Sequence, residues 1–157
     1  MSGISIETAS ETDLDGMLRL LQLLFAIEKD FHFDEAGGRR GLLMLLEQTD
    51  ALLLVAKSAE RVIGMCSAQL NISTAAGGYS LLVEDLVVSR EQRGRGVAKR
   101  LLESVGRWAA ARDVLRFQLV ADRENGAALA FYKKRGWQLS NLLVLYNHPE
   151  TQTTGEV

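Results

Sequence analysis

The segment from residue 81 to residue 102 constrains the fold more than any other part of the chain. It reads LLVEDLVVSREQRGRGVAKRLL, which is an apolar run typical of a β-strand, then a turn rich in glycine and arginine, then apolar residues at helical spacing. A strand that leads through a short turn into a helix is a building unit of domains that mix helices with a sheet. The segment therefore predicts an α/β fold.

The turn at residues 93–99, RGRGVAK, also predicts a binding site. A helix N-terminus presents unpaired backbone N–H groups, and Gly94 and Gly96 let that backbone approach a ligand closely. Such a turn can form a nest of N–H groups for a phosphate or diphosphate, with the arginines and Lys99 as counter-charges. The Walker pattern is absent, and the dinucleotide pattern Gly-x-Gly-x-x-Gly fails because position 99 is Lys. The alternative is a tight turn with solvated arginines.

Hydrophobic periodicity predicts the other elements. The expected strands are 4–9, 51–57, 61–73, 79–89, 115–121 and a closing strand or hairpin at 137–147. The expected helices are 11–29, 39–48, 97–112 and 126–135, with Ser10 and Asp13 as a capping pair, Asn125 as the cap of the last helix and Gly136 at its end. We therefore expect one α/β domain with a mixed sheet over residues 1–148, and a disordered polar tail at 149–157.

Composition excludes several classes of function. The chain has 157 residues and a formal net charge of −2, which argues against a general nucleic-acid binder. It shows no signal peptide and no apolar stretch long enough to span a bilayer, so we expect a soluble cytoplasmic protein that binds no membrane. The single cysteine, Cys66, is expected to be a small buried residue in a reducing compartment. No cluster of His, Cys, Asp and Glu has metal-ligand spacing, so we expect no metal.

Two motifs together resemble the GNAT acetyltransferase superfamily. Arg93, Gly96 and Ala98 match its Arg/Gln-x-x-Gly-x-Gly/Ala signature. NGAALAFYKKRGW resembles its second hallmark, in which an asparagine (Asn125) is followed seven residues later by a tyrosine (Tyr132). The resemblance covers about residues 80–140 and implies a mixed, mostly antiparallel twisted sheet flanked by helices.

The resemblance also implies acetyl-CoA as the acetyl donor. The diphosphate of acetyl-CoA would lie on the backbone of Gly94, Arg95, Gly96, Val97, Ala98 and Lys99, beside Arg93. Its pantetheine arm would pair with the backbone of Leu86, Val87 and Val88 by strand addition. Asn125 would bond to the same arm, although a role as a helix cap alone is the alternative.

Acetyl transfer to an amine needs a base, an oxyanion donor and an acid. The resemblance implies that Tyr132 protonates the leaving thiolate; the alternative is that Tyr132 is a core aromatic residue. Glu84 is the favoured base, acting directly or through a water, and an ion pair is the alternative. In a regular strand Glu84 shares a face with Leu82 and Leu86, and Asp85 points to the opposite face. A backbone N–H at a bulge in this strand would stabilise the oxyanion.

The acceptor is expected to bind near AIEKDFHFDEAGG, the segment that joins the first two helices. Acidic groups beside aromatic rings suit a cationic amine, and the candidate residues are Glu28, Asp30, Phe31 and Asp34. This stretch is also similar to the same region of diamine and polyamine acetyltransferases. The alternative is a solvated acidic loop.

These features together predict an enzyme. We expect an acetyl-CoA-dependent N-acetyltransferase that acetylates the primary amine of a small, cationic acceptor in a ternary complex. A protein or peptide N-acetyltransferase and a non-catalytic CoA-binding sensor domain are the alternatives. The resemblance also implies a homodimer.

Overall fold

A computed structural model describes residues 3–28, 30 and 32–149. The strands are β1 (Ile4–Thr8), β2 (Ala51–Ser58), β3 (Arg61–Ser73), β4 (Gly78–Val88) and β5 (Arg116–Leu119). The helices are α1 (Leu14–Ile27), α2 (Glu35–Glu47), α3 (Val97–Ala110) and α4 (Gly126–Lys134), with short 3₁₀ turns η1 (Glu11–Asp13) and η2 (Arg90–Gln92). The chain divides into two compact units, residues 1–122 and 123–157.

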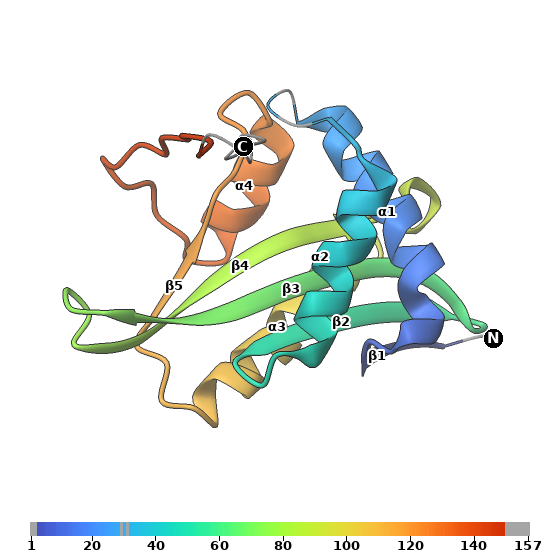
Figure 1. Ribbon diagram of the computed structural model, residues 1–157, viewed down its shortest axis with the longest axis horizontal. Helices are drawn as coiled ribbons and strands as arrows, with labels where there is room; N and C mark the ends of the chain where they lie inside the picture. The colour runs from blue at the N-terminus through green and yellow to red at the C-terminus, as the bar shows by residue number, and fades with distance from the viewer. Residues whose placement is uncertain (1–2, 29, 31, 150–157) are drawn as a thin grey trace, which may run out of the picture. The chain divides into compact units, whose positions relative to one another are not determined.

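The first unit is built on a five-stranded sheet in the order β1-β2-β3-β4-β5 (Figure 1). The first three pairings are antiparallel, whereas β5 runs parallel to β4. A parallel neighbour needs a crossover connection, and α3 supplies it between β4 and β5. This arrangement confirms the mixed, mostly antiparallel sheet that the sequence predicts.

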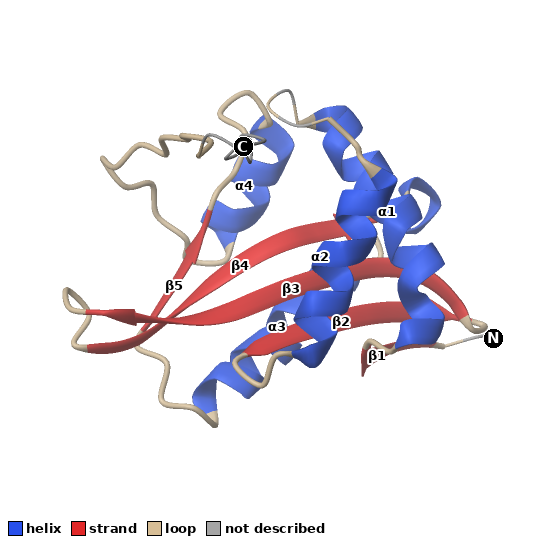
Figure 2. Cartoon of the chain, in the orientation of Figure 1, coloured by secondary structure: helices blue, strands red, loops and turns tan. Residues whose placement is uncertain are grey.

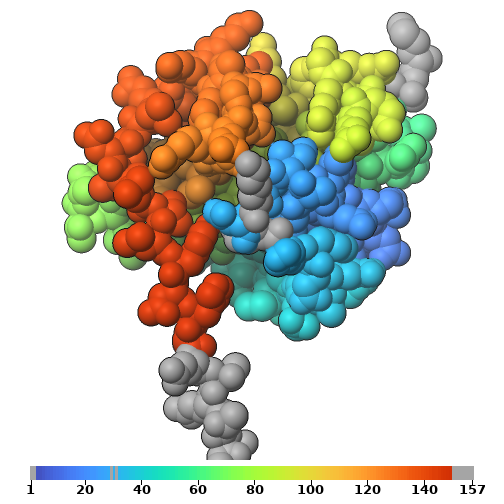
Figure 3. Space-filling model, turned by 90° about the horizontal axis from the view of Figure 1, so that it is seen from above, coloured from blue at the N-terminus to red at the C-terminus, as the bar shows by residue number. Residues whose placement is uncertain are grey.

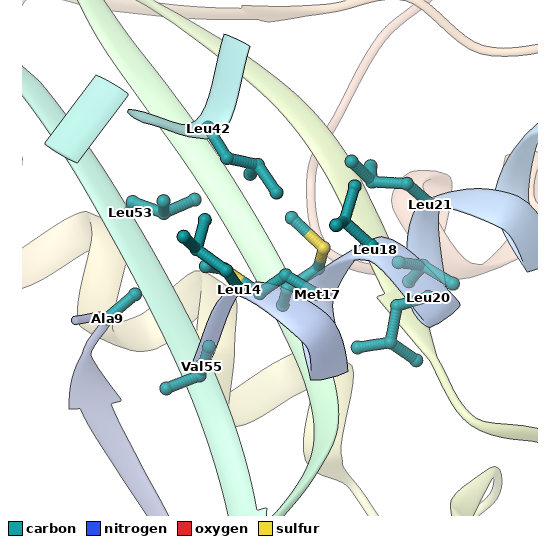
Figure 4. Packing of buried hydrophobic residues seen from close by; sticks show 11 residues of the cluster. Ala9, Leu14, Met17, Leu18, Leu20, Leu21, Leu42, Leu53 and Val55 are labelled. Carbon is teal, nitrogen blue, oxygen red and sulfur yellow. The ribbon is translucent and has the colours of Figure 1, made fainter. Parts of the chain in front are cut away.

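Helices cover both faces of this sheet. Helices α1 and α2 lie side by side on one face, and α3 lies on the opposite face (Figure 2). The core under α1 and α2 is a cluster of buried apolar side chains from these two helices and from the sheet, among them Met17, Leu18, Leu42, Leu53 and Val55 (Figure 4). Complete burial of one such side chain contributes about 1.5–3 kcal/mol.

Two glycines bring helices close to β3. A Cβ built at Gly64 would lie 3.2 Å from Val97 Cγ1 and 3.3 Å from Leu101 Cδ1, so the first turns of α3 rest almost directly on the strand. On the other face, a Cβ at Gly16 of α1 would lie 2.7 Å from Val62 Cβ. The absence of side chains at these two contacts therefore fixes both helices against the centre of the sheet.

Several boundaries differ from the sequence-based expectation. The expected capping pair is present, with the Ser10 N–H donating to Asp13 Oδ2 at 2.9 Å, but the first turn is 3₁₀ before α1 begins. Helix α2 begins at Glu35, four residues earlier than expected.

Within the described helices, none is long and apolar enough to cross a membrane.

The expected closing strand at 137–147 is wrong. Residues 137–149 contain no strand, and Leu139, Leu142 and Leu145 are exposed. A strand is stable only when a neighbour supplies its hydrogen bonds, and none of the described strands pairs with this segment. Of the expected tail, residues 150–157 lie outside the described part of the chain.

Candidate active site

The centre of β4 contains a β-bulge. Ser67 of β3 is the partner of Glu84, and Met65 is the partner of Val87. One residue of β3 lies between these two pairs, but two residues of β4 do, so β4 carries one extra residue at Asp85–Leu86. Asp85 has a φ of +55°, the left-handed conformation, which Asp and Asn tolerate better than other residues with side chains. The bulge that we expected in this strand is therefore present, and Asp85 occupies its unusual backbone position.

The bulge brings two neighbouring carboxylates to one face of the sheet. Residues that are partners across a ladder direct their side chains to the same face, so Glu84 lies on the face of Ser67. The Ser67 hydroxyl lies 3.2 Å from Asp85 Oδ2, so the Asp85 carboxylate reaches the same buried serine. The expectation that Glu84 and Asp85 point to opposite faces holds only for a regular strand, and it is wrong here.

The extra residue also changes the other neighbours of Glu84. Glu84 shares its face with Leu82 and with Val87, which belongs to the core under α1 and α2. The expectation that Leu86 shares this face is wrong, because the inserted residue reverses the alternation after Asp85.

The carboxylates in this part of the first unit perturb one another. Burial, and then the negative charge of Glu84, raise the pKa of Asp85 to about 6, while the hydrogen bond from Ser67 opposes the shift. Glu28, at the end of α1, is half-buried, and its pKa is raised first by burial and then by the charges of Asp85, Asp122, Glu84 and Asp30. The structure therefore brings acidic groups from β4, from the loop after α1 and from the segment after β5 near Glu28.

The residues expected to bind the acceptor lie in different places in the structure. Glu28 and Asp30 belong to this acidic group. Asp34 instead lies at the N-cap of α2, where its carbonyl accepts the Gly38 N–H at 2.8 Å. Phe31 lies outside the described residues. Sequence reasoning missed Asp122, which follows β5, because no local pattern shows that it lies near Glu28.

The glycine-rich turn after β4 has the backbone geometry of an anion site. Gly94 and Gly96 both have a φ of +77°, and Gly96 is the N-cap of α3. The Arg93 Nε donates to the Val88 carbonyl at 3.2 Å, which ties the turn to the end of β4. The turn is exposed and includes the yellow-green surface in Figure 3. The first N–H groups of α3 have no acceptor within their own helix, so they can donate to a bound anion.

The second unit contains the Asn-to-Tyr helix. Asn125 caps α4, its Oδ1 accepting the Ala128 N–H at 3.1 Å, and Gly136, with a φ of +89°, follows the end of the helix. The ring of Tyr132 contacts those of Phe131 and Trp137 edge to face, with centroids 5.4 and 5.8 Å apart. The cap and the end of this helix confirm the sequence-based expectation.

The single cysteine does not supply a reactive thiolate. Cys66 is buried, and burial followed by the charge of Asp85 raises the pKa of its thiol to about 12, so it is not a thiolate nucleophile near neutral pH. Among the described residues, no group of His, Cys, Asp and Glu can hold a metal ion.

Comparison with known proteins identifies the family. Residues 17–137 match the Acetyltransferase (GNAT) family, and the chain belongs to that family. It is 32% identical over 74 residues to a streptothricin acetyltransferase of Escherichia coli, and 43% identical over 61 residues to N-alpha-acetyltransferase 80 of Mus musculus. These matches cover 47% and 39% of this chain, but only 42% and 18% of the relatives. The chain therefore matches less than half the length of each of these relatives.

Solved structures share the fold. A transcriptional regulator from Bacillus halodurans C-125 has a TM-score of 0.83 at 21% identity, covering 93% of this chain and 100% of that one. The aminoglycoside N-acetyltransferase AAC(6')-Iy, in complex with CoA, has a TM-score of 0.81 at 18% identity, covering 94% and 96%. The aminoglycoside 6'-N-acetyltransferase AAC(6')-IG from Acinetobacter haemolyticus has a TM-score of 0.76 at 24% identity, covering 94% and 99%.

Proposed function

We propose that the protein transfers an acetyl group from acetyl-CoA to the primary amine of a small, cationic acceptor, by direct attack in a ternary complex. The observation that carries this proposal is the continuity of β4: an acidic bulge at Glu84–Asp85 leads within ten residues to the glycine turn at Gly94–Gly96. A single strand and turn thus supply a place for the reacting groups and a place for a diphosphate.

The donor would lie along the second half of β4. Strand β5 pairs only with Ser80–Val83, so among the described strands none covers that edge of β4 from Glu84 to Val88. Main-chain groups on such an edge can pair with an extended ligand, as the amide-containing pantetheine arm is. The donor-binding residues of this proposal are Leu86, Val87, Val88, Arg93, Gly94, Arg95, Gly96, Val97, Ala98, Lys99 and Asn125.

The chemistry is assigned to three groups. An alkyl ammonium ion has a pKa of roughly 10 and must lose a proton before it can attack. Glu84 takes this proton directly or through a water, and an N–H at the Asp85–Leu86 bulge stabilises the oxyanion. Tyr132 protonates the departing thiolate.

The acidic group at Glu28, Asp30 and Asp85 favours a cationic acceptor. The relatives named for streptothricin and for aminoglycosides agree with a small-molecule acceptor. A second candidate is a protein N-terminus, which the similarity to N-alpha-acetyltransferase 80 favours.

The test is thiol release from acetyl-CoA, measured with polyamines, aminoglycosides, streptothricin, amino acids and short peptides. We expect saturable release with one cationic small-molecule class and formation of its mono-acetylated product by mass spectrometry. Release with peptides alone would support the second candidate. Tight CoA binding without release from any member of the panel would contradict catalysis and favour the sensor domain.

A further inference from the structure

Asp85 has a more restricted environment than Glu84. It occupies the left-handed position of the bulge, its carboxylate accepts from the buried Ser67, and it is half-buried, whereas Glu84 is exposed. The Ser67 hydroxyl also lies 3.3 Å from the Glu84 carbonyl, so its single proton is shared between the two neighbouring residues of β4. A carboxylate in such a position is held still, which a proton acceptor needs in order to act on a bound amine.

We propose that Asp85 is a second catalytic carboxylate, and that Glu84 and Asp85 act as one pair that holds the proton leaving the acceptor's ammonium group. This inference rests on the acetyl transfer proposed above. It assigns the base to a pair of groups that the bulge brings to one face, instead of to Glu84 alone.

The proton count is consistent with this assignment. The ammonium gives one proton to the pair, and its nitrogen then attacks the carbonyl carbon of the thioester to form a C–N bond. The C–S bond breaks, the nitrogen loses a second proton as the amide forms, and the thiolate is protonated to CoA. One proton thus ends on the CoA thiol, and the other passes from the pair to water.

The charged surroundings support proton storage at this place. The titratable groups that interact electrostatically with Asp85 are Glu84 on its own strand, Glu28 at the end of α1 and the Cys66 thiol on β3. The pKa of Asp85, about 6, lies closer to neutral pH than that of an ordinary aspartate, as an efficient base requires. When two groups interact in this way, the titration belongs to the pair.

The decisive variant is Asp85→Asn, with Asp113→Asn as its control. Asparagine tolerates a positive φ and can accept from Ser67, so the variant keeps the bulge and removes only the proton acceptor. Asp113 has the same φ of +55° but lies in the loop after α3. We expect Asp85→Asn to lower kcat/KM for the acceptor by about 100-fold, the lower end for loss of a general base. Its acetyl-CoA affinity and melting temperature should remain those of the wild type, and Asp113→Asn should keep full activity.

A double variant distinguishes a pair from two separate contributions. If Glu84 and Asp85 act as one unit, adding Glu84→Gln to Asp85→Asn should lower the rate by no more than roughly threefold beyond the slower single variant. An unchanged rate in Asp85→Asn would overturn the proposal. A double variant whose loss equals the product of the two single losses would also overturn it.

The direction of the pH shift supplies a second test. Glu84→Gln removes the charge that raises the Asp85 pKa, so the acid limb of kcat/KM should move to lower pH. Ser67→Ala removes the hydrogen bond that lowers this pKa, so the limb should move to higher pH. If Glu84→Gln and Ser67→Ala moved the acid limb equally and in the same direction, that result would contradict the pair.

The protonation of Asp85 can also be followed by carboxyl ¹³C NMR, which does not require an active enzyme. If wild-type protein released no thiol with any acceptor, the proposed function would fail, and the NMR titration would still decide the pair. In the wild type, the Asp85 carboxyl resonance should titrate with a midpoint near pH 6. This resonance should be absent from the spectrum of Asp85→Asn, and its midpoint should lie at lower pH in Glu84→Gln. Independent titration of the two carboxylates would overturn the pair even in an active enzyme.

Discussion

The substitution Gly96→Val tests the anion site at the start of α3. Gly96 has a φ of +77°, and a Cβ there would meet no atom within 4 Å, so the valine meets strain but no clash. A non-glycine residue held in this conformation costs about 1–3 kcal/mol. The turn can relieve that strain by changing φ, which rotates neighbouring N–H groups away from a bound diphosphate. Each hydrogen bond to a charged group contributes about 1.5–3 kcal/mol, so loss of two predicts roughly 100- to 10,000-fold weaker binding.

The assay is isothermal titration with acetyl-CoA, combined with thermal unfolding, and Gly77→Val is the matched control. Gly77, between β3 and β4, has a φ of +80° and is also surrounded by open space, so its substitution imposes the same backbone strain. We expect both variants to lose similar stability and only Gly96→Val to lose binding. Equal acetyl-CoA affinity in the two variants would refute a diphosphate site on this backbone.

Three further substitutions, the last with Gly106→Ala as its control, test other parts of the account. Tyr132→Phe should lower kcat far more than acetyl-CoA affinity, and an unchanged kcat would remove the tyrosine from the mechanism. Glu84→Gln should lower the highest kcat/KM that the enzyme reaches near neutral pH, because Asp85 then takes the proton without its neighbour; an unchanged maximum would point to another base. Gly64→Ala places a methyl group 3.2 Å from Val97 Cγ1, and it should lower the free energy of unfolding in urea by about 1–3 kcal/mol. Gly106→Ala, with no neighbour within 4 Å, should instead raise it by about 0.5–1 kcal/mol; equal effects would contradict close packing of α3 on β3.

The elements with strong local patterns were predictable from the sequence. The apolar runs of β2, β3 and β4, the glycines before α3 and the Asn125 cap of α4 each depend on neighbouring residues, and the structure confirms them. The irregular conformation of the closing segment was not predictable, because apolar residues at 137–147 favour a strand only where a partner strand exists. The early start of α2 also has no strong local signal, since two glycines precede its apolar residues.

The candidate site was predictable only in part. The turn at Gly94–Gly96 and the position of Glu84 within a strand follow from local pattern. The bulge was expected only from the family resemblance, because a one-residue insertion relative to β3 depends on the partner strand and has no signal in the sequence of β4 itself. The pairing of Asp85 with Ser67 and the nearness of Asp122 to Glu28 join residues far apart in the chain, so only the folded structure brings them together.

A crystal structure with bound acetyl-CoA would test the central claim most directly. The account predicts the diphosphate on the N–H groups of Gly94–Lys99, the pantetheine arm along Leu86–Val88, and the thioester beside the Glu84–Asp85 bulge. Acetyl-CoA bound away from this turn, or a thioester distant from both carboxylates, would contradict it.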